Sequence, residues 1–266
     1  MMALVRFEYA DETLPHRDFC VPPLRMIHLR VLGASSLTRA DDEELDAVIA
    51  QPKRFALLVY LVLAHHGFYR RDRLVSIFWP EADQEHARAA LRKSVHVLRR
   101  GLGDGVVIGR GDEELAIDRS TIRCDALDFE AAIEAGRPAH ALELYQGDVL
   151  DGFLISDATD FVQWLDERRF HYRQQAATAA WVLAQRYESE SHLTDAIESA
   201  RRAVKLAPLN ERVVQKVIAM LDRVGDRAGA IDLYERFRAR LASDLSVDPA
   251  PETQALVTAI RLRQNG

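Results

Sequence analysis

The sequence predicts a mostly α-helical protein with a small β component, in which a small helical domain with a β-hairpin precedes an all-α domain of helical repeats. Three observations predict this architecture. Apolar residues recur every three or four positions over most of the chain after Pro52. Two short strand-like runs follow the most basic stretch, and a pattern of Ala, Leu and aromatic residues near the C-terminus recurs 34 positions later.

The overall composition is typical of a globular protein. The chain has 266 residues, 48% of them hydrophobic, which is enough for one large or two ordinary domains with cores. Residues 1–20 carry scattered charges and no apolar run, so we expect no signal peptide and a cytoplasmic protein. The longest apolar run, Phe55 to Ala64, is shorter than the roughly 20 residues that cross a bilayer and predicts a buried helix. Cys20 and Cys124 have no metal-ligand spacing, so we expect neither a disulfide nor a metal site.

The charge is distributed unevenly. The whole chain has a net charge of -6, but the segment from Pro52 to Arg110 has 11 Lys or Arg against 5 Asp or Glu. A basic segment within an acidic protein is typical of a surface that contacts a phosphate backbone. On charge alone, an ordinary solvated surface explains the asymmetry equally well.

The first elements follow from local patterns. Ile27 to Leu32 alternates apolar and polar residues, which predicts a strand, and further short strands are expected near Leu37 and at Leu45 to Ile49. Pro52 then begins a helix that buries one apolar face and ends by Gly67. A second, shorter helix is expected from Arg71 to Phe78, since the residue before Pro80 disfavours helix.

The third helix, from Asp83 to Leu102, has two distinct faces. One face carries the apolar residues Ala87, Leu91, Val95, Leu98 and Leu102, at spacings of 4, 4, 3 and 4. The opposite face carries the basic residues Arg88, Arg92, Lys93, His96, Arg99 and Arg100, and no acid occurs from His86 to Arg100. An exposed helix usually mixes charges of both signs, so a face of one sign favours contact with phosphates over plain solvent exposure. We expect Glu81, Asp83 and Glu85, near the helix start, to act as caps rather than as ligands.

A β-hairpin is expected after this helix. Val106 to Ile108 and Glu114 to Ile117 predict two strands, joined by the loop Gly109 to Asp112. Three helices followed by such a hairpin predict a winged helix-turn-helix. Within the loop, Arg110 is a candidate for contact with a minor groove.

Three motifs carry a family resemblance. The runs Gln51-Pro-Lys-Arg-Phe-Ala-Leu-Leu-Val-Tyr-Leu, Arg70-Arg-Asp-Arg-Leu-Val-Ser-Ile-Phe-Trp-Pro and Ala87-Arg-Ala-Ala-Leu-Arg-Lys-Ser-Val-His-Val-Leu-Arg-Arg resemble the OmpR-type winged helix of SARP-type regulators. The resemblance implies that the third helix lies in the major groove of double-stranded DNA. It assigns base recognition to Arg88, Arg92, Lys93 and His96 and backbone contact to Arg99 and Arg100, and Arg70, Arg71 and Arg110 are further candidate DNA contacts. Many members have Gln where this chain has Lys93, so the preferred base sequence is not carried over.

Helical repeats are expected after residue 122. Leu183, Ala184, Tyr187, Ala196, Ala200, Ala203 and Pro208 have the relative spacings of a tetratricopeptide repeat (TPR). The second copy, 34 positions later, is Val217, Ile218, Leu221, Ala230, Tyr234, Phe237 and Ala242. Small residues at Ala196 and Ala230 allow paired helices to approach closely.

The same half resembles the bacterial transcriptional activator domain of SARP-type regulators, through Tyr145-Gln-Gly-Asp-Val-Leu and Trp164-Leu-Asp-Glu-Arg-Arg. This resemblance implies binding to direct repeats in promoters, often as paired protomers, and recruitment of RNA polymerase. The predicted organisation is an N-terminal tail at residues 1–25, a winged helix at 26–121 and a TPR-like activator domain at 122–266. Nothing before Met26 contributes to the resemblance, so residues 1–25 are either a genuine tail or a stretch that precedes the natural start at Met26.

Two other functions stay open. The first is a protein-interaction scaffold whose winged helix no longer binds DNA, which the salt dependence of DNA affinity would distinguish. The second is a hydrolase or transferase in the repeat domain, which would need a polar pocket with shifted titrating groups. The acidic pairs Asp41-Asp42 and Glu43-Glu44 lie in a polar loop, and no general acid and base or Ser, His and Asp set is evident. We therefore expect no enzymatic activity, no cofactor and no metal.

Overall fold

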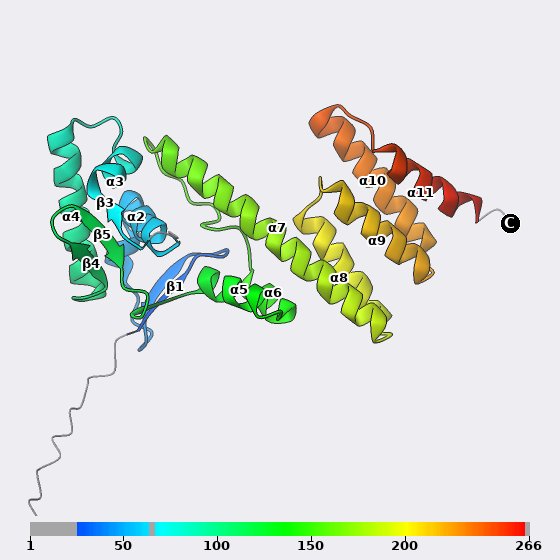
Figure 1. Cartoon of the computed structure of the whole chain (residues 1–266), viewed down its shortest axis with the longest axis horizontal. Coiled ribbons are helices and arrows are strands. Elements are labelled where there is room, and N and C mark those ends of the chain that lie inside the picture. Colours follow the sequence, from blue (N-terminus) through cyan, green and yellow to red (C-terminus); the bar gives the residue numbers. More distant parts are fainter. Residues whose placement is uncertain (1–25, 64–66, 264–266) are drawn as a thin grey trace, which may run out of the picture.

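The computed structural model describes residues 26–63 and 67–263, so the predicted tail at residues 1–25, with Cys20, lies outside the described residues. The chain is mostly helical, with short strands confined to the N-terminal half (Figure 1). The elements of this half are β1 (Ile27–Arg30), β2 (Ser36–Arg39), α1 (Asp46–Ile49), α2 (Pro52–Leu63), β3 (Tyr69–Arg70), α3 (Arg71–Phe78), α4 (Gln84–Leu102), β4 (Val107–Arg110), β5 (Glu114–Ile117) and β6 (Ile122–Cys124).

The three predicted helices and the hairpin are present and form a winged helix. In α2 every residue from Phe55 to Leu63 is buried, as the apolar run predicts. The strands β3, β5 and β4 form a sheet in which β4 and β5 are the antiparallel wing. The sequence placed Arg110 in the loop of the hairpin, and this was wrong: Arg110 is the last residue of β4 and pairs with Glu114 across the ladder. The turn is shorter than expected and contains Gly111, whose φ of 59° suits glycine.

A second sheet lies at the N-terminus of the described chain, in the order β2, β1, β6. The strand β1 pairs with β2 antiparallel and with β6 parallel, and β6 begins at Ile122. The second half of the chain therefore begins with a strand of this N-terminal sheet. The boundary between residues 121 and 122 stays a prediction.

The strand expected at Leu45 to Ile49 is wrong, because this segment is the short helix α1. Its buried residues are Leu45 and Val48, which are three positions apart, as on a helix. A strand would have turned Leu45, Ala47 and Ile49 to the same side. The side chain of Val48 lies so close to Gly101 of α4 that a Cβ at Gly101 would be 2.7 Å from Val48 Cγ2. The packing of α1 on the end of α4 therefore decides the local conformation.

The second half is an array of antiparallel helices. It comprises α5 (Asp125–Glu134), α6 (Pro138–Leu144), α7 (Thr159–Ser189), α8 (Leu193–Leu206), α9 (Glu211–Arg223), α10 (Arg227–Leu245) and α11 (Pro251–Leu262). The two predicted repeat copies fall on the end of α7 with α8 and on α9 with α10. Ala196 and Ala230 are fully buried, so the repeat prediction is confirmed.

The long helix α7 joins the two halves. It has 31 residues and extends from the winged helix to the repeats (Figure 1). At its beginning, the ring of Trp164 lies 4.8 Å from that of Tyr60 in α2, and Phe161 lies 5.2 Å from Phe78 in α3. Such aromatic pairs add to the free energy gained by burying their surface. The position of α7 relative to the winged helix is therefore determined by a packed aromatic cluster.

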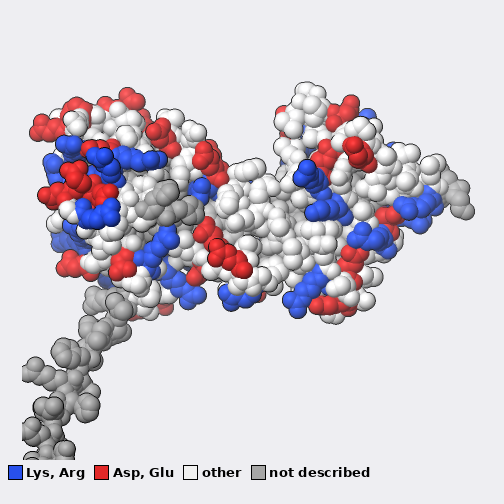
Figure 2. All heavy atoms as spheres, in the orientation of Figure 1, with Lys and Arg blue, Asp and Glu red and all other residues white. Residues whose placement is uncertain are grey.

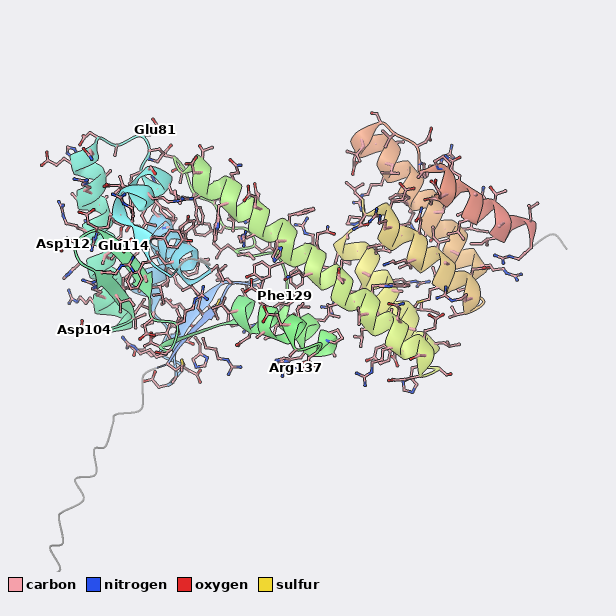
Figure 3. The ribbon with its side chains drawn as sticks, in the orientation of Figure 1. Glu81, Asp104, Asp112, Glu114, Phe129 and Arg137 are labelled. Carbon is pink, nitrogen blue, oxygen red and sulfur yellow. The ribbon has the colours of Figure 1, made fainter. Side chains whose placement is uncertain are left out.

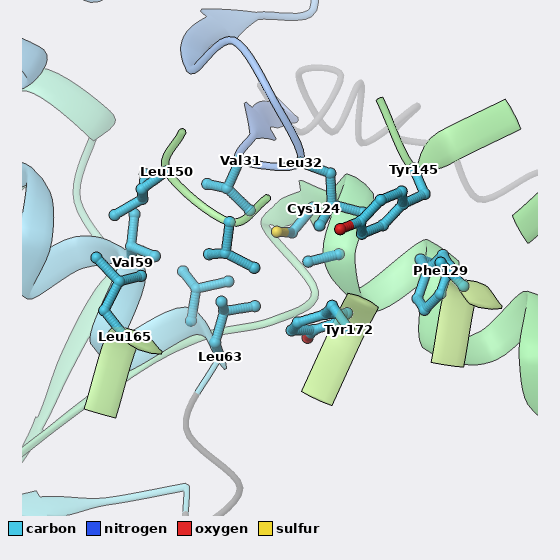
Figure 4. Packing of buried hydrophobic residues seen from close by; sticks show 14 of the residues in the cluster. Val31, Leu32, Val59, Leu63, Cys124, Phe129, Tyr145, Leu150, Leu165 and Tyr172 are labelled. Atoms are coloured by element: carbon cyan, nitrogen blue, oxygen red, sulfur yellow. The ribbon is translucent and has the colours of Figure 1, made fainter. Parts of the chain in front are cut away.

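The buried core is continuous between the halves (Figure 4). Leu165 of α7 lies near Val59 of α2, and the backbone of Val31 and Leu32 follows β1 into the same region. The carboxylate of Asp125, the first residue of α5, accepts hydrogen bonds from the N–H groups of Val31 and Leu32 at 2.9 and 3.0 Å.

Within residues 26–63 and 67–263, no helix is both long and apolar enough to span a bilayer.

Candidate nucleic-acid interface

The helix α4 begins at a well-formed cap. The Asp83 carboxylate accepts hydrogen bonds from the N–H groups of Glu85 and His86 at 3.1 and 3.0 Å. The hydrogen bond from the backbone of His86, then that from its ring, lowers the pKa of Asp83 below its ordinary value. Asp83 therefore acts as the N-cap, while Glu81 lies in the loop before the helix (Figure 3).

The two faces of α4 lie as the periodicity predicts. All five residues of the apolar stripe are buried, with exposed fractions from 0 to 4%. The side chains of Arg88, Arg92, Lys93, His96 and Arg100 are exposed. Burial of the stripe fixes which side of the helix faces solvent, and that side is cationic. Figure 2 shows the Lys and Arg side chains gathered around α4 and the wing, with acidic side chains between them.

Arg99 differs from the other cationic residues of α4. Its side chain is only partly exposed, and its Nε donates a hydrogen bond to the carbonyl oxygen of Val107 in β4 at 3.0 Å. This bond connects the end of α4 to the wing. Arg99 therefore helps to set the position of the wing, in addition to the backbone contact that the resemblance implies.

Two of the predicted DNA contacts are paired with acids of the same chain. Arg88 Nη2 lies 2.8 Å from the Oδ1 atom of Asp72, in the first turn of α3, and both side chains are about half exposed (49% and 48%). The hydrogen bond between them raises the pKa of Arg88 and lowers that of Asp72. Arg110 forms an ion pair with Glu114 and lies over the ring of Phe68 at 4.7 Å. Exposed ion pairs of this kind contribute little to stability, so a phosphate can replace the acid at little cost.

A groove of about 450 Å³ lies between α3, α4 and the wing. Arg71, Arg92 and Arg99 line it together with the wing acids Asp112 and Glu113. Desolvation, followed by repulsion from Arg99, lowers the pKa of Arg71. The Nε atom of Arg71 is buried and has no hydrogen-bond partner within the described residues. Four arginines (Arg71, Arg88, Arg92 and Arg99) line the groove against three acids (Asp72, Asp112 and Glu113), so it has a small excess of positive charge.

The remaining predicted contacts are basic residues on the surface. Arg92, Lys93, His96 and Arg100 of α4 form no ion pair with any residue in the described ranges. Arg70, just before α3, is also exposed. Of these residues, Arg92 and His96 line the groove together with Arg71 and Asp112, so the structure brings together the second motif, the third motif and the wing.

Sequence reasoning missed the acids of the interface. Asp72 lies 16 positions before Arg88, so only the packing of α3 on α4 brings the two together. The Arg110 and Glu114 pair follows from the hairpin register, which places the two residues opposite each other. A sequence prediction with a shorter turn would have identified this pair. Figure 3 shows Asp112 and Glu114 beside α4, and Asp104 just beyond its end.

The other candidate chemistry is not supported by the geometry. Asp41 to Glu44 are exposed residues of the turn after β2, where Glu43 pairs with Arg39. Cys124 is buried, and burial raises the pKa of its thiol well above the ordinary value. Among the residues described, no group of three or more His, Cys, Asp or Glu side chains is placed to hold a metal ion.

A winged helix with a cationic third helix, joined by a shared core to helical repeats, defines a class of two-part transcription regulators. The family model of the bacterial transcriptional activator domain matches residues 114–261, more than half of the chain. The chain belongs to the SARP family of bacterial transcriptional activators, which contain this domain.

Individual relatives agree with this assignment. The chain is 30% identical over 219 residues to the regulatory protein AfsR of Streptomyces coelicolor. The aligned region covers 77% of this chain but only 21% of AfsR. It is 29% identical over 241 residues to the transcriptional regulatory protein MoaR1 of Mycobacterium tuberculosis, covering 81% and 74% of the two chains. The solved structure of Mycobacterium tuberculosis EmbR in complex with a low affinity phosphopeptide is similar, with a TM-score of 0.67, 25% identity, and coverage of 90% of this chain and 65% of that one. These relatives are regulators, as expected for a family that is not enzymatic.

Proposed function

We propose that this protein is a sequence-specific activator that binds direct repeats in promoter DNA by inserting α4 into the major groove. The observation that carries the proposal is the combination of a fully buried apolar stripe and an exposed cationic face on one 19-residue helix. A major groove admits a helix, and its base edges distinguish all four base pairs. Burial of the stripe leaves the cationic face exposed, which supports this proposed contact with the duplex.

The residues have different proposed roles. Arg88, Arg92, Lys93 and His96, in the first half of α4, read base edges, because recognition helices contact bases near their N-terminal ends. Arg99 and Arg100 at the end of α4, with Arg70 and Arg71 at the start of α3, contact phosphates. Arg110 on the wing reaches the adjacent minor groove once its ion pair with Glu114 is replaced by contacts with DNA.

The repeat half supplies the proposed protein contacts. Its helices contact RNA polymerase or a second protomer, and two protomers bind the two direct repeats as a homodimer on DNA. The aromatic cluster of Tyr60, Phe78, Phe161 and Trp164 supports this role, because it fixes the repeats relative to the DNA-binding face. A protein with this role acts on the chromosome, so we propose that it is cytoplasmic.

The test is to select bound duplexes from a random pool and then to measure affinity for the selected sequence over a range of salt concentrations. We expect a defined repeated motif, and a slope of log affinity against log salt of about -0.9 for each phosphate contact. A selected pool in which no sequence is enriched, or a slope of log affinity against log salt near zero, would contradict the proposal.

The second candidate function is a TPR-like scaffold with a vestigial winged helix. The ion pairs of Arg88 with Asp72 and of Arg110 with Glu114 favour it, because they occupy two predicted DNA contacts. The same measurement separates the two functions: a scaffold of this kind would show no affinity for duplex DNA even at low salt.

A further inference from the structure

A groove in the repeat half has a different chemistry from the interface on α4. It lies between α8 and α10, has a volume of about 620 Å³, and is called here the α8–α10 groove. Its floor is apolar and includes the buried side chains of Leu221, Leu233 and Phe237. A floor of this kind is typical of sites that take up apolar side chains of a peptide.

The walls of the α8–α10 groove are cationic. Arg201 and Lys205 lie on α8, and Arg236 and Arg240 lie on α10. Each pair is four residues apart, so its two side chains lie on the same face of their helix, about 6 Å apart along the axis. The only acid lining the groove within the described chain is Asp232. Residues 122–266 contain 18 Lys or Arg against 23 Asp or Glu, so this local excess of cations runs against the charge of the half.

The cations of the groove are available for exchange with a ligand. Arg201 pairs with Asp226 at 3.2 Å and Arg240 with Asp244 at 3.7 Å, and Arg236 pairs with Asp232. The three arginine side chains are 53 to 70% exposed in these pairs, and exposed pairs are weak. Lys205 is exposed and has no ion pair within the part of the chain that the structure describes.

A second groove continues from the first. It has a volume of about 1010 Å³, lies between α8, α7 and the loop after α6, and shares Arg201, Lys205 and Pro208 with the α8–α10 groove. A bound chain can therefore extend beyond the four cations, although this second groove is lined by the acids Glu143, Asp148, Asp151 and Glu198 as well as by Arg202 and Arg173.

We propose that the α8–α10 groove binds an acidic peptide segment of a partner protein, with two carboxylates on its walls and an apolar side chain on its floor. A peptide supplies both kinds of group along one chain, whereas a nucleic acid backbone has no aliphatic side chain for Leu221 and Leu233. The inference deepens the proposed protein contact of the repeat half, and it does not require that α4 binds DNA.

The test uses the full chain and a library of random 12-residue peptides displayed on phage. We expect the selected peptides to share at least two Asp or Glu residues next to an apolar residue. The affinity of one selected peptide, measured by fluorescence anisotropy, is expected to fall about tenfold or more in the double variant Lys205→Glu with Arg236→Glu, because two weak attractions become repulsions. The double variant Lys205→Gln with Arg236→Gln gives a smaller loss in the same direction.

The matched control is Arg212→Glu with Arg238→Glu, which makes the same change of charge on α9 and α10 outside both grooves. We expect it to bind the peptide as the unchanged chain does. Circular dichroism checks that every variant is folded, and duplex binding by the same proteins reports α4 separately. Enrichment of basic or uncharged peptides, no enrichment at all, or an equal loss in the control pair overturns the inference. Loss of duplex binding only in the Lys205 and Arg236 variants would also overturn it, by assigning the groove to nucleic acid.

Discussion

The helices α4 and α10 both expose several arginines, but they use them differently. On α10, Arg236 pairs with Asp232, Arg240 with Asp244 and Arg238 with Glu235, so each has an acid three or four residues away on its own helix. On α4, no arginine forms an ion pair within its own helix among the described residues, although Glu85 lies three residues before Arg88, and the acid that pairs with Arg88 comes from α3. Pairs within a helix stabilise that helix. The difference indicates that the charges of α10 stabilise their own helix until a ligand replaces the paired acids, whereas those of α4 have no such role within their helix.

The largest expected effect comes from removing a free cation at the centre of α4. We expect Arg92→Ala to relax sequence preference, because the guanidinium fork bonds guanine bidentately and contributes about 1 to 3 kcal/mol of discrimination. The measurement is the profile of selected duplexes together with affinities for the preferred site and single-base variants of it. The matched control is Arg238→Ala on α10, which should leave the profile unchanged. An Arg92→Ala protein with the original profile would refute the assignment of Arg92 to base readout.

A smaller effect is expected from the end of the same helix. Arg100→Ala removes a phosphate contact, so affinity should fall severalfold for all duplexes alike, and the slope of log affinity against log salt should become less negative by about 0.9. Affinity measured on a specific and an unrelated duplex at several salt concentrations checks both effects. A loss confined to the specific duplex would instead place Arg100 on a base.

The exposed cationic face of α4 could be predicted from the sequence, because it depends on periodicity within a single helix. The spacing of Ala87, Leu91 and Val95 alone orients α4, and the buried stripe confirms it. The repeat pairs followed from spacing in the same way. What could not be predicted depends on contacts between distant segments. Asp72 reaches Arg88 only through helix packing, and the parallel pairing of β1 with β6 joins residues about 95 positions apart, for which no local pattern exists.

The conformation of the short elements could not be predicted from the sequence either. The segment from Leu45 to Ile49 is too short for periodicity to decide between helix and strand, and its contact with Gly101 favours the helix. The hairpin was predicted, but its register was shifted, so Arg110 was placed in the loop instead of opposite Glu114. Local patterns therefore identified the cationic face, whereas the acids around it required the tertiary structure.

The pairing of Arg88 with Asp72 offers a third test, with two effects of opposite sign. Asp72→Asn removes a negative charge from the interface, so non-specific affinity should rise, by about two- to fivefold. The same change frees Arg88 from its partner, so preference at the base pair that Arg88 contacts should weaken. Asp104→Asn, beyond the end of α4, is the control with the same chemistry. An increase in affinity without any change in the profile would show that Asp72 does not position Arg88.

The smallest effect concerns stability and tests the comparison directly. Asp232→Ala removes an acid four residues before Arg236 on α10, and the exposed pair is expected to contribute about 0.3 to 0.5 kcal/mol to the free energy of unfolding. Arg92→Ala removes a cation that lies one turn after Arg88, so we expect no loss, or a slight gain, since like charges at this spacing repel. Urea unfolding at low salt, followed by circular dichroism, measures both variants, and added salt should reduce the two effects because it screens exposed charges. If Arg92→Ala destabilised the chain as much as Asp232→Ala, the charges of α4 would serve its own fold, and the contrast between the two helices would be lost.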